Sequence, residues 1–206
     1  MAHPDVSLAE LAVKRLGRTR RALDALESGS MENALRAGQY LFELFTTKPN
    51  NKLLCCGNGG SAALCAHLVG ELAGWFMKHR SALPAVDLTS CAAAITAIVN
   101  DTDGQFIFAR QVESVAQRGD VLLAVSTSGN SRNVVNAIEY AKKLGVYTIG
   151  LLGPKGGKCA SLVDLPVLTP GEDTATIQDL HEVIMHIWCD ALEGLMRDDR
   201  EPAVVR

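Results

Sequence analysis

Residues 119–145 read GDVLLAVSTSGNSRNVVNAIEYAKKLG and carry the clearest fold signal in the chain. The run VLLAV at 121–125 is continuously apolar, which is typical of a strand buried on both faces of a parallel sheet. A turn of small polar residues follows, and a helical pattern then covers 131–144. Strand, turn and helix in this order form part of a βαβ unit, which predicts an α/β architecture.

The same order recurs on both sides of this stretch. Further short apolar runs read KLLCC, AVDL, YTIGLL and LPVL, and helical patterns fall at about 60–77, 91–99, 105–117 and 174–197. Their alternation predicts an open α/β sheet, which binds ligands at the carboxyl ends of its strands. Two amphipathic helices are expected before it, at 6–28 and 31–47, joined by the turn signal SGS.

The chain is therefore expected to have one main domain with a helical extension. Residues 1–50 form the helical segment, which is expected to pack on the domain or on a neighbouring subunit. Residues 51–198 form the α/β domain, and the polar tail 199–206 is expected to be flexible.

Composition excludes several classes of protein. The chain has 206 residues, 48% hydrophobic and 21% charged, with a formal net charge of −3, so no basic footprint for nucleic acid is present. It has no run of 18 apolar residues for a membrane span and no secretory signal at its start. Six cysteines without a C-x-x-C pair are expected to be reduced, buried thiols of a cytoplasmic protein.

Two turns of small residues each follow an apolar run and precede a helical pattern. The first, residues 57–61, reads GNGGS, and the second, residues 126–131, reads STSGNS. Backbone N–H groups, hydroxyls and a helix N-terminus in such turns can bind an anion. Neither turn fits a nucleoside triphosphate or dinucleotide motif. Together they predict one phosphorylated small molecule, although tight turns with serine N-caps, Ser131 among them, would also explain the pattern.

Imidazole and carboxylate groups sit within the flanking helical patterns. His67 and Glu71 are four residues apart and share a helix face, and the last helix carries Gln178, His181 and His186. This composition suits a zinc site or an acid/base pair. Spacing does not decide between the last two histidines: Gln178 and His186 are about 12 Å apart along a helix, whereas Gln178 and His181 are closer. The structural alternative is that His67 and Glu71 form a plain ion pair and that the histidines of the last helix are partly exposed.

Four separated blocks of the chain resemble the sugar isomerase (SIS) domain, and among its members the phosphoheptose isomerases. They read CGNGGSAALCAHLVGEL, VND, GDVLLAVSTSGNSRNVVNAIEYAKKLG and IQDLHEVIMHIWCDALE, and the similarity runs from about residue 30 to 195. The resemblance implies a five-stranded parallel sheet flanked by helices. It also implies a homotetramer with sites at subunit interfaces.

The resemblance further implies a role for each matching residue. Glu71 and His186 would be catalytic, and residues 126–128 with Ser131 would hold the phosphate. One Zn²⁺ per subunit would be bound by His67, Glu71, Gln178 and His186. The substrate-binding residues implied are Asn58, Gly59, Gly60, Ser61, Glu71, Asn100, Asp101, Ser126, Thr127, Ser128, Ser131 and Gln178.

The reaction implied is an aldose–ketose isomerisation in heptose biosynthesis. Sedoheptulose 7-phosphate would become D-glycero-D-manno-heptopyranose 7-phosphate, or its C2 epimer, through a cis-enediol. Glu71 would remove the C1 proton, His186 would be its acid/base partner, and zinc would stabilise the enediolate charge. Glu71 would then serve as both ligand and base.

Two positions depart from the family pattern. Trp75 stands where many members have arginine, and Ala175 where some have an acid that Glu172 or Asp173 would replace. Two other functions stay open on the sequence. One is a non-catalytic SIS protein that binds a replication initiator or a sugar phosphate, and the other is an isomerase of a different sugar phosphate.

Overall fold

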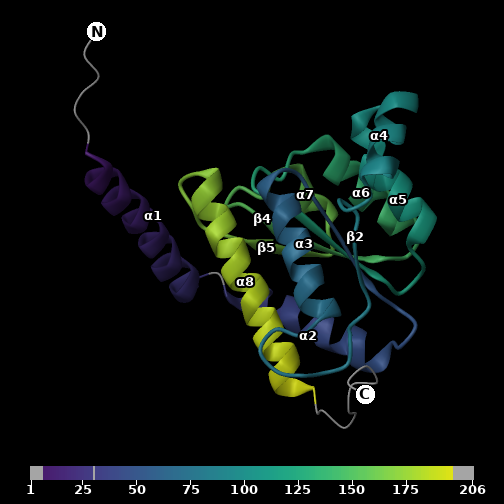
Figure 1. Ribbon diagram of the computed structural model, residues 1–206, viewed down its shortest axis with the longest axis horizontal. Coiled ribbons are helices and arrows are strands. Elements are labelled where there is room, and N and C mark those ends of the chain that lie inside the picture. The colour runs from purple at the N-terminus through teal and green to yellow at the C-terminus, as the bar shows by residue number, and fades with distance from the viewer. Residues whose placement is uncertain (1–6, 30, 197–206) are drawn as a thin grey trace.

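The computed structural model describes residues 7–29 and 31–196 (Figure 1). Its strands are β1 (Leu53–Gly57), β2 (Ala85–Asp87), β3 (Val121–Ser126), β4 (Tyr147–Leu152) and β5 (Leu165–Leu168). Its helices are α1 (Leu8–Gly29), α2 (Met31–Thr47), α3 (Gly60–Ala73), α4 (Ala92–Asp101), the short 3₁₀ helix η1 (Gly104–Phe106), α5 (Ile107–Val115), α6 (Arg132–Lys143), α7 (Gly157–Leu162) and α8 (Thr174–Leu195).

The five strands form one parallel sheet in the order β2-β1-β3-β4-β5. This confirms the predicted fold class. The chain runs outward from β1 in one direction to β2 and in the other to β3, so β1 and β3 flank the point where the strand order reverses. In open α/β sheets, ligands bind at the carboxyl ends of the strands at this switch point.

Each strand buries both of its faces, which explains the continuous apolar runs. Leu53 and Cys55 of β1 belong to the core beneath α2, α3 and α8, whereas Leu54 and Cys56 belong to the core beneath α5, α6 and α7. Successive side chains of a strand point to opposite faces, so the sheet lies between two helical layers.

The two N-terminal helices differ in how they meet this domain. Helix α2 packs against α8, where the Trp188 indole nitrogen donates to the Ala34 carbonyl at 2.8 Å and lies over Gly38. Helix α1 projects away from the sheet (Figure 1) and exposes Leu8 and Leu16. Ser30 of the expected SGS turn and the expected flexible tail, residues 199–206, lie outside the described residues.

One predicted helix end was wrong, and one short helix was missed. Helix α3 ends at Ala73 rather than near 77, because Gly74 leaves the helix and the Arg80 guanidinium donates to the carbonyls of Glu71, Leu72 and Gly74. These bonds satisfy the last carbonyls of the helix. The six-residue helix α7 was not predicted, since GKCASL is too short to show an apolar period.

The cysteines match the expectation of unbridged thiols. All six are free, and all but Cys91 are buried. Burial raises the pKa of Cys159 to about 11, which keeps this thiol protonated. None of the helices within residues 7–29 and 31–196 has the length and apolarity to cross a membrane.

Candidate active site

The two turns of small residues meet at the switch point of the sheet. The glycine turn (residues 57–61) follows β1, and the serine turn (residues 126–131) follows β3, its neighbour in the sheet. The side-chain amides of Asn58 and Asn133 join them by two reciprocal hydrogen bonds of 2.9 and 2.8 Å. The turns therefore form one polar surface at the edge where this fold class binds ligands.

The serine turn is held by its own side chains and by a close backbone approach. Ser126 Oγ accepts from the Gly129 N–H at 3.1 Å, and Ser128 Oγ accepts from the Asn130 N–H at 3.2 Å. Gly129 has a φ of 63°, and a Cβ there would lie 1.9 Å from the Gly156 carbonyl oxygen. Only glycine fits this position, both for its φ and for its space.

Ser131 occupies the N-cap position of α6 without acting as a cap. Its side chain makes no capping hydrogen bond, and its Oγ lies 3.4 Å from Ser126 Oγ. The hydroxyls of Ser126 and Ser131 thus lie together at the N-terminus of a twelve-residue helix. Such an end favours an anion through its N–H groups and its dipole.

The glycine turn contacts the last helix directly. Gly59 is the N-cap of α3 with a φ of 54°. A Cβ on Gly60 would lie 2.5 Å from the Gln178 side-chain nitrogen, so the amide of Gln178 lies against the backbone of this turn. Ser61 is buried at the start of α3. The glycine turn and Gln178 therefore form one packed unit.

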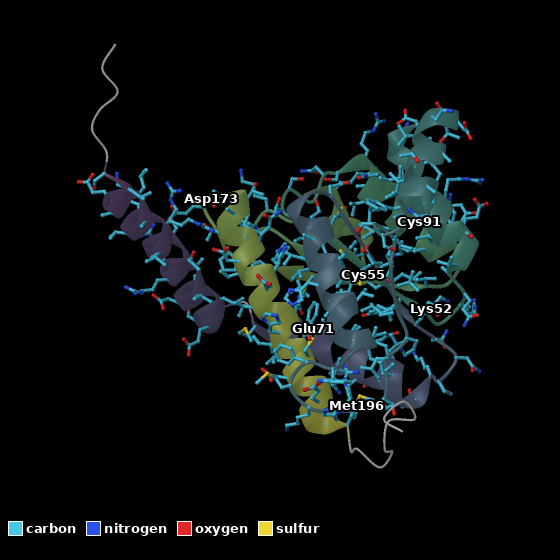
Figure 2. All side chains as sticks on the ribbon, in the orientation of Figure 1. Lys52, Cys55, Glu71, Cys91, Asp173 and Met196 are labelled. Carbon is cyan, nitrogen blue, oxygen red and sulfur yellow. The ribbon has the colours of Figure 1, made fainter. Side chains whose placement is uncertain are left out.

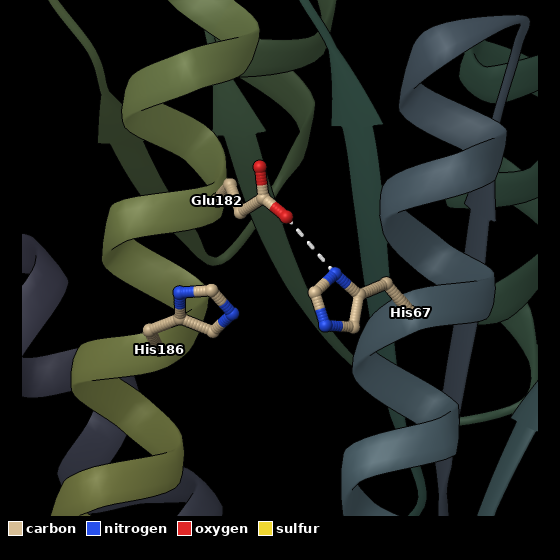
Figure 3. Close-up of side chains that lie close together, drawn as sticks. All are labelled: His67, Glu182 and His186. Atoms are coloured by element: carbon tan, nitrogen blue, oxygen red, sulfur yellow. Dashed lines mark hydrogen bonds and ion pairs between the residues drawn. The ribbon is translucent and has the colours of Figure 1, made fainter. Parts of the chain in front are cut away.

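Further along the same two helices, His67 lies between two carboxylates. Its Nδ1 is 3.0 Å from Glu182 Oε1, and its Nε2 is 3.1 Å from Glu71 Oε1 (Figure 3 draws the first contact). The His186 ring faces the His67 ring edge-on, with 5.2 Å between their centroids. Figure 2 places Glu71 among the side chains between α3 and α8. We call α3 and α8 with these four side chains the helix pair.

The helix pair contains a group that can hold a metal ion. His67, Glu182 and His186 each offer one ligand atom, and these atoms all lie within 4.8 Å of one another. A narrow crevice around them is also lined by Leu68, Glu71, Met185 and Cys189. Two imidazoles and a carboxylate are a common ligand set for zinc.

A buried carboxylate fixes the loop that follows α3. Glu193 accepts from the backbone N–H groups of Phe76, Met77 and Lys78 at 2.7–2.8 Å, and Arg80 lies 3.5 Å from it. We call this arrangement the Glu193 brace. The Phe76 ring stacks on His186 with 5.2 Å between centroids, so the brace reaches the helix pair through that ring.

The remaining expected site residues lie elsewhere. Asn100 and Asp101 end α4, where they are exposed and the Asn100 amide donates to the Asp101 carboxylate at 2.8 Å. Helix α4 stands at the α5–α6 side of the sheet, away from α8 (Figure 1). His181, which the structural alternative treats as partly exposed and the resemblance as a neighbouring or structural residue, is fully buried, and burial lowers its pKa to about 4.

Sequence reasoning missed Glu182. It lies one helical turn after Gln178 and one turn before His186, so it shares their helix face. That spacing of one helical turn is the sequence signal by which Glu182 could have been found.

The two departures from the family pattern are exposed positions. Trp75 is exposed and stacks on His79, with 4.2 Å between ring centroids. Ala175 is exposed on the first turn of α8. The carboxylates considered as replacements pair with α1: Glu172 with Arg21 at 2.8 Å and Asp173, labelled in Figure 2, with an arginine at 3.0 Å.

Comparisons with known proteins agree with this geometry. Residues 16–153 match the model of the SIS domain family. The chain is 49% identical to the phosphoheptose isomerase of a Nitratiruptor species over 146 residues. The aligned region covers 71% of this chain and 78% of that protein. It is 46% identical to the phosphoheptose isomerase of Pelobacter propionicus over 177 residues, which are 85% of this chain and 93% of that protein.

Solved structures give the same result. The structure of phosphoheptose isomerase GmhA from Neisseria gonorrhoeae superposes with a TM-score of 0.85 at 34% identity, over 91% of this chain and all of that one. A phosphoheptose isomerase from Francisella tularensis gives 0.87 at 29% identity, over 92% of this chain and all of that one. The chain therefore belongs to the phosphoheptose isomerase family of SIS-domain proteins.

Proposed function

We propose that the chain is an aldose–ketose isomerase that converts D-sedoheptulose 7-phosphate to D-glycero-D-manno-heptopyranose 7-phosphate, or its C2 epimer, in heptose biosynthesis. The observation that carries the proposal is the contact of His67 with Glu71 beside His186, on helices that also border the two turns. The names of the relatives, each called a phosphoheptose isomerase, support the choice of substrate.

The two turns would hold the substrate. The hydroxyls of Ser126, Ser128 and Ser131, with Thr127, would bind the phosphate at the N-terminus of α6. Asn58, Gly59, Gly60 and Ser61 would contact the sugar, with Gln178 held against the same turn. Asn100 and Asp101 would bind sugar hydroxyls from α4.

The helix pair would move the proton. Glu71 would take the proton from C1 of the ketose, the C1–H electron pair would form the C1–C2 double bond of a cis-enediol, and the C2 carbonyl π pair would move to its oxygen, which takes up a proton. The C1 oxygen would then lose its proton as the C1 carbonyl forms, and C2 would receive a proton from Glu71. His186 exchanges protons with the oxygens on C1 and C2. The apolar side chains of Leu68 and Met185 line the same crevice, and the Phe76 ring stacks on His186.

The donor set of the helix pair fits a zinc ion, because imidazole and carboxylate groups converge in it. His67, Glu71, Gln178 and His186 are the ligands that the family resemblance implies, one ion per subunit. A bound zinc ion supplies Lewis-acid polarisation of the substrate oxygens. One ring nitrogen of His67 would bind the ion, and the carboxylate on the other nitrogen would orient the ring, since Glu182 and Glu71 each contact one of the two.

The protein would act as a cytoplasmic homotetramer with its sites at subunit interfaces. Large apolar side chains on α1 and α4 support association, since Leu8 is 83% exposed, Leu16 66% and Val99 50%. In this assembly the N-terminal segment 1–50 would pack on its own domain through α2 and on a neighbouring subunit through α1, and residues 51–198 would form the SIS domain.

The test is NMR of the purified protein with sedoheptulose 7-phosphate, with and without a zinc chelator. We expect the signals of an aldose 7-phosphate to grow, and to grow more slowly after chelation. The coupling constants of the product give its configuration at C2. A ketose spectrum that stays unchanged with the metal-loaded protein would contradict the proposed substrate.

A further inference from the structure

We infer that Arg15 of α1 is a positioning residue: it holds the first two turns of α8, and through them it keeps the Gln178 amide against the glycine turn. The inference deepens the proposed function, on which it rests, because Gln178 belongs to the proposed site. It gives a role in that site to α1, a helix that lies outside the two turns and the helix pair.

The first support is the set of hydrogen bonds that α1 makes to α8. The Arg15 guanidinium donates to Thr176 Oγ1 at 2.6 Å and also to Asp179 Oδ2. Thr19, one helical turn after Arg15, donates to the same Asp179 oxygen at 2.9 Å. Thr176 and Asp179 stand on either side of Gln178 in the chain and are three residues apart, so they share a helix face. Arg15 therefore fixes the rotation of α8 at the level of Gln178.

The second support is burial, which separates Arg15 from a neighbouring arginine of α1. Thr176 is fully buried, and the Arg15 side chain is 35% exposed. Arg21 and Glu172 join the same two parts of the chain at 2.8 Å, but their side chains are 63% and 57% exposed. An exposed ion pair contributes little, whereas a charged hydrogen bond to a buried group contributes more. Arg15 is therefore the contact that matters, and Arg21 is its matched control.

The third support is charge. Asp173 caps α8 by accepting from the Thr176 N–H at 2.8 Å, and Asp179 follows less than two turns later. Carboxylates are favourable at the start of a helix, but two of them close together repel one another. The Arg15 guanidinium pairs with Asp179 and lies 3.7 Å from Asp173, and Arg18 pairs with Asp173 at 3.0 Å. The arginines thus allow both carboxylates to stay at this end of α8, where Figure 2 labels Asp173.

The fourth support is the close fit of the Gln178 amide. A Cβ on Gly60 would lie 2.5 Å from the amide nitrogen and 2.6 Å from its oxygen, so the amide touches the backbone of the glycine turn. A small rotation of α8 would press the amide into this turn or withdraw it. The contact of Trp188 with Gly38 holds α8 about 15 Å further along its axis, so it controls the start of the helix less directly.

The experiment compares the full chain carrying Arg15→Gln, Arg15→Lys or the control Arg21→Gln. Hydrogen exchange measured by mass spectrometry follows the backbone amides of residues 174–182. Zinc affinity, measured by competition with a chromophoric chelator, reports on Gln178, which is among the ligands that the resemblance implies. We expect Arg15→Gln to speed exchange about tenfold and to lower zinc affinity about tenfold, as for other residues that orient a ligand.

The other two variants separate geometry from charge. Arg15→Lys keeps the charge but cannot reach both partners with a planar fork, so it should recover part of each loss. Arg21→Gln should change neither quantity by more than about twofold, because the ion pair that it removes is exposed.

A double-mutant cycle tests whether Arg15 acts through the Gln178 amide. Once Gln178→Ala has removed the amide, adding Arg15→Gln should lower zinc affinity by less than about twofold. A second tenfold loss in that background would overturn the inference, and so would unchanged exchange in Arg15→Gln. Neither readout needs turnover, so a wild-type protein that fails the NMR assay would contradict the proposed substrate and leave the role of Arg15 to be decided by these measurements.

Discussion

The serine turn and the helix pair are built in opposite ways. Several hydrogen bonds of the serine turn join residues within 126–131, as in the bond from the Gly129 N–H to Ser126 Oγ, and the Cys159 N–H adds one from outside to the Gly129 carbonyl. The helix pair joins residues far apart in the chain, since His67 and Glu182 are separated by 115 positions. The first is set by local backbone geometry, and the second depends on how α3 and α8 pack.

This difference corresponds to a division of labour in the proposed mechanism. In that mechanism the serine turn would hold a phosphate that does not react, so its interactions would be the same in the ground and transition states. The helix pair acts on the atoms that change. Damage to the turn should therefore raise KM, and damage to the helix pair should lower kcat.

Glu71→Gln should break the helix pair most severely. An amide cannot accept the C1 proton, so we expect kcat to fall about 1,000-fold, or about 4 kcal/mol in the barrier, with KM nearly unchanged. Steady-state kinetics measures this, and circular dichroism with size-exclusion chromatography checks that the fold and the oligomer persist. Near-native turnover in this variant would show that Glu71 is not the base.

Glu193→Gln tests whether the helix pair depends on packing outside itself. The side chains of Glu193 and Arg80 are only 3% and 7% exposed, so removing the carboxylate charge leaves a buried guanidinium without its counter-ion. We expect the free energy of unfolding to fall by about 3 kcal/mol, measured by urea denaturation. The Phe76 N–H donates to Glu193 and the Phe76 ring stacks on His186, so kcat should fall as well.

The control for the brace is Asp190→Asn, which alters an exposed carboxylate on the same helix. It should change the free energy of unfolding by less than about 0.5 kcal/mol. Equal stability of the two variants would mean that the loop 74–80 is held by other contacts, and that α3 and α8 pack without the brace.

The same contrast explains what the sequence could predict. The five strands, the carboxyl-edge turns and the sheet type follow from local apolar runs and turn residues, which the structure preserves nearly residue for residue. Gly129 has the positive φ of 63° that glycine adopts without strain, and glycine in the STSGNS pattern is a turn residue that the sequence shows directly. Local chemistry is readable because its cause lies within a few residues.

The residues that form the helix pair could not be predicted from the sequence in the same way. Glu182 shares a helix face with Gln178 and His186, but periodicity alone does not distinguish a site residue from an exposed surface residue. His181 was a reasonable candidate by spacing, and only the packing of α8 on the sheet shows that its ring is buried. Which face of α8 meets α3 is a tertiary property, set by contacts such as Trp188 against Gly38.

His181 allows the buried face of α8 to be tested through pH. Its folded-state pKa is about 4, below the ordinary value of about 6.5, so the unfolded chain takes up the proton first as pH falls. The contribution to stability is complete above pH 6.5 and is lost between pH 6.5 and 4. Linkage gives a loss of about 2 kcal/mol between pH 7.5 and 5.

The measurement is urea denaturation at pH 7.5 and 5, with a chelator present, for the wild type and for His181→Leu. The leucine variant has no proton to bind at this position, so its loss of stability over that range should be about 2 kcal/mol smaller. If both proteins lose the same amount, the imidazole is not held neutral in the core, and the two faces of α8 differ less than the structure indicates.

Ser128→Ala combined with Ser131→Ala should have the smallest effect of these changes, a weaker binding of phosphate by the serine turn. Both hydroxyls would donate to the phosphate, while the backbone N–H groups of the turn remain to bind it. We expect KM to rise about tenfold, which is about 1.4 kcal/mol, with kcat within a factor of two. Ser161→Ala, an exposed serine on α7, is the control and should leave both constants unchanged. A fall in kcat at constant KM would place these serines with the reacting groups, and the separation between a binding turn and a catalytic helix pair would then fail.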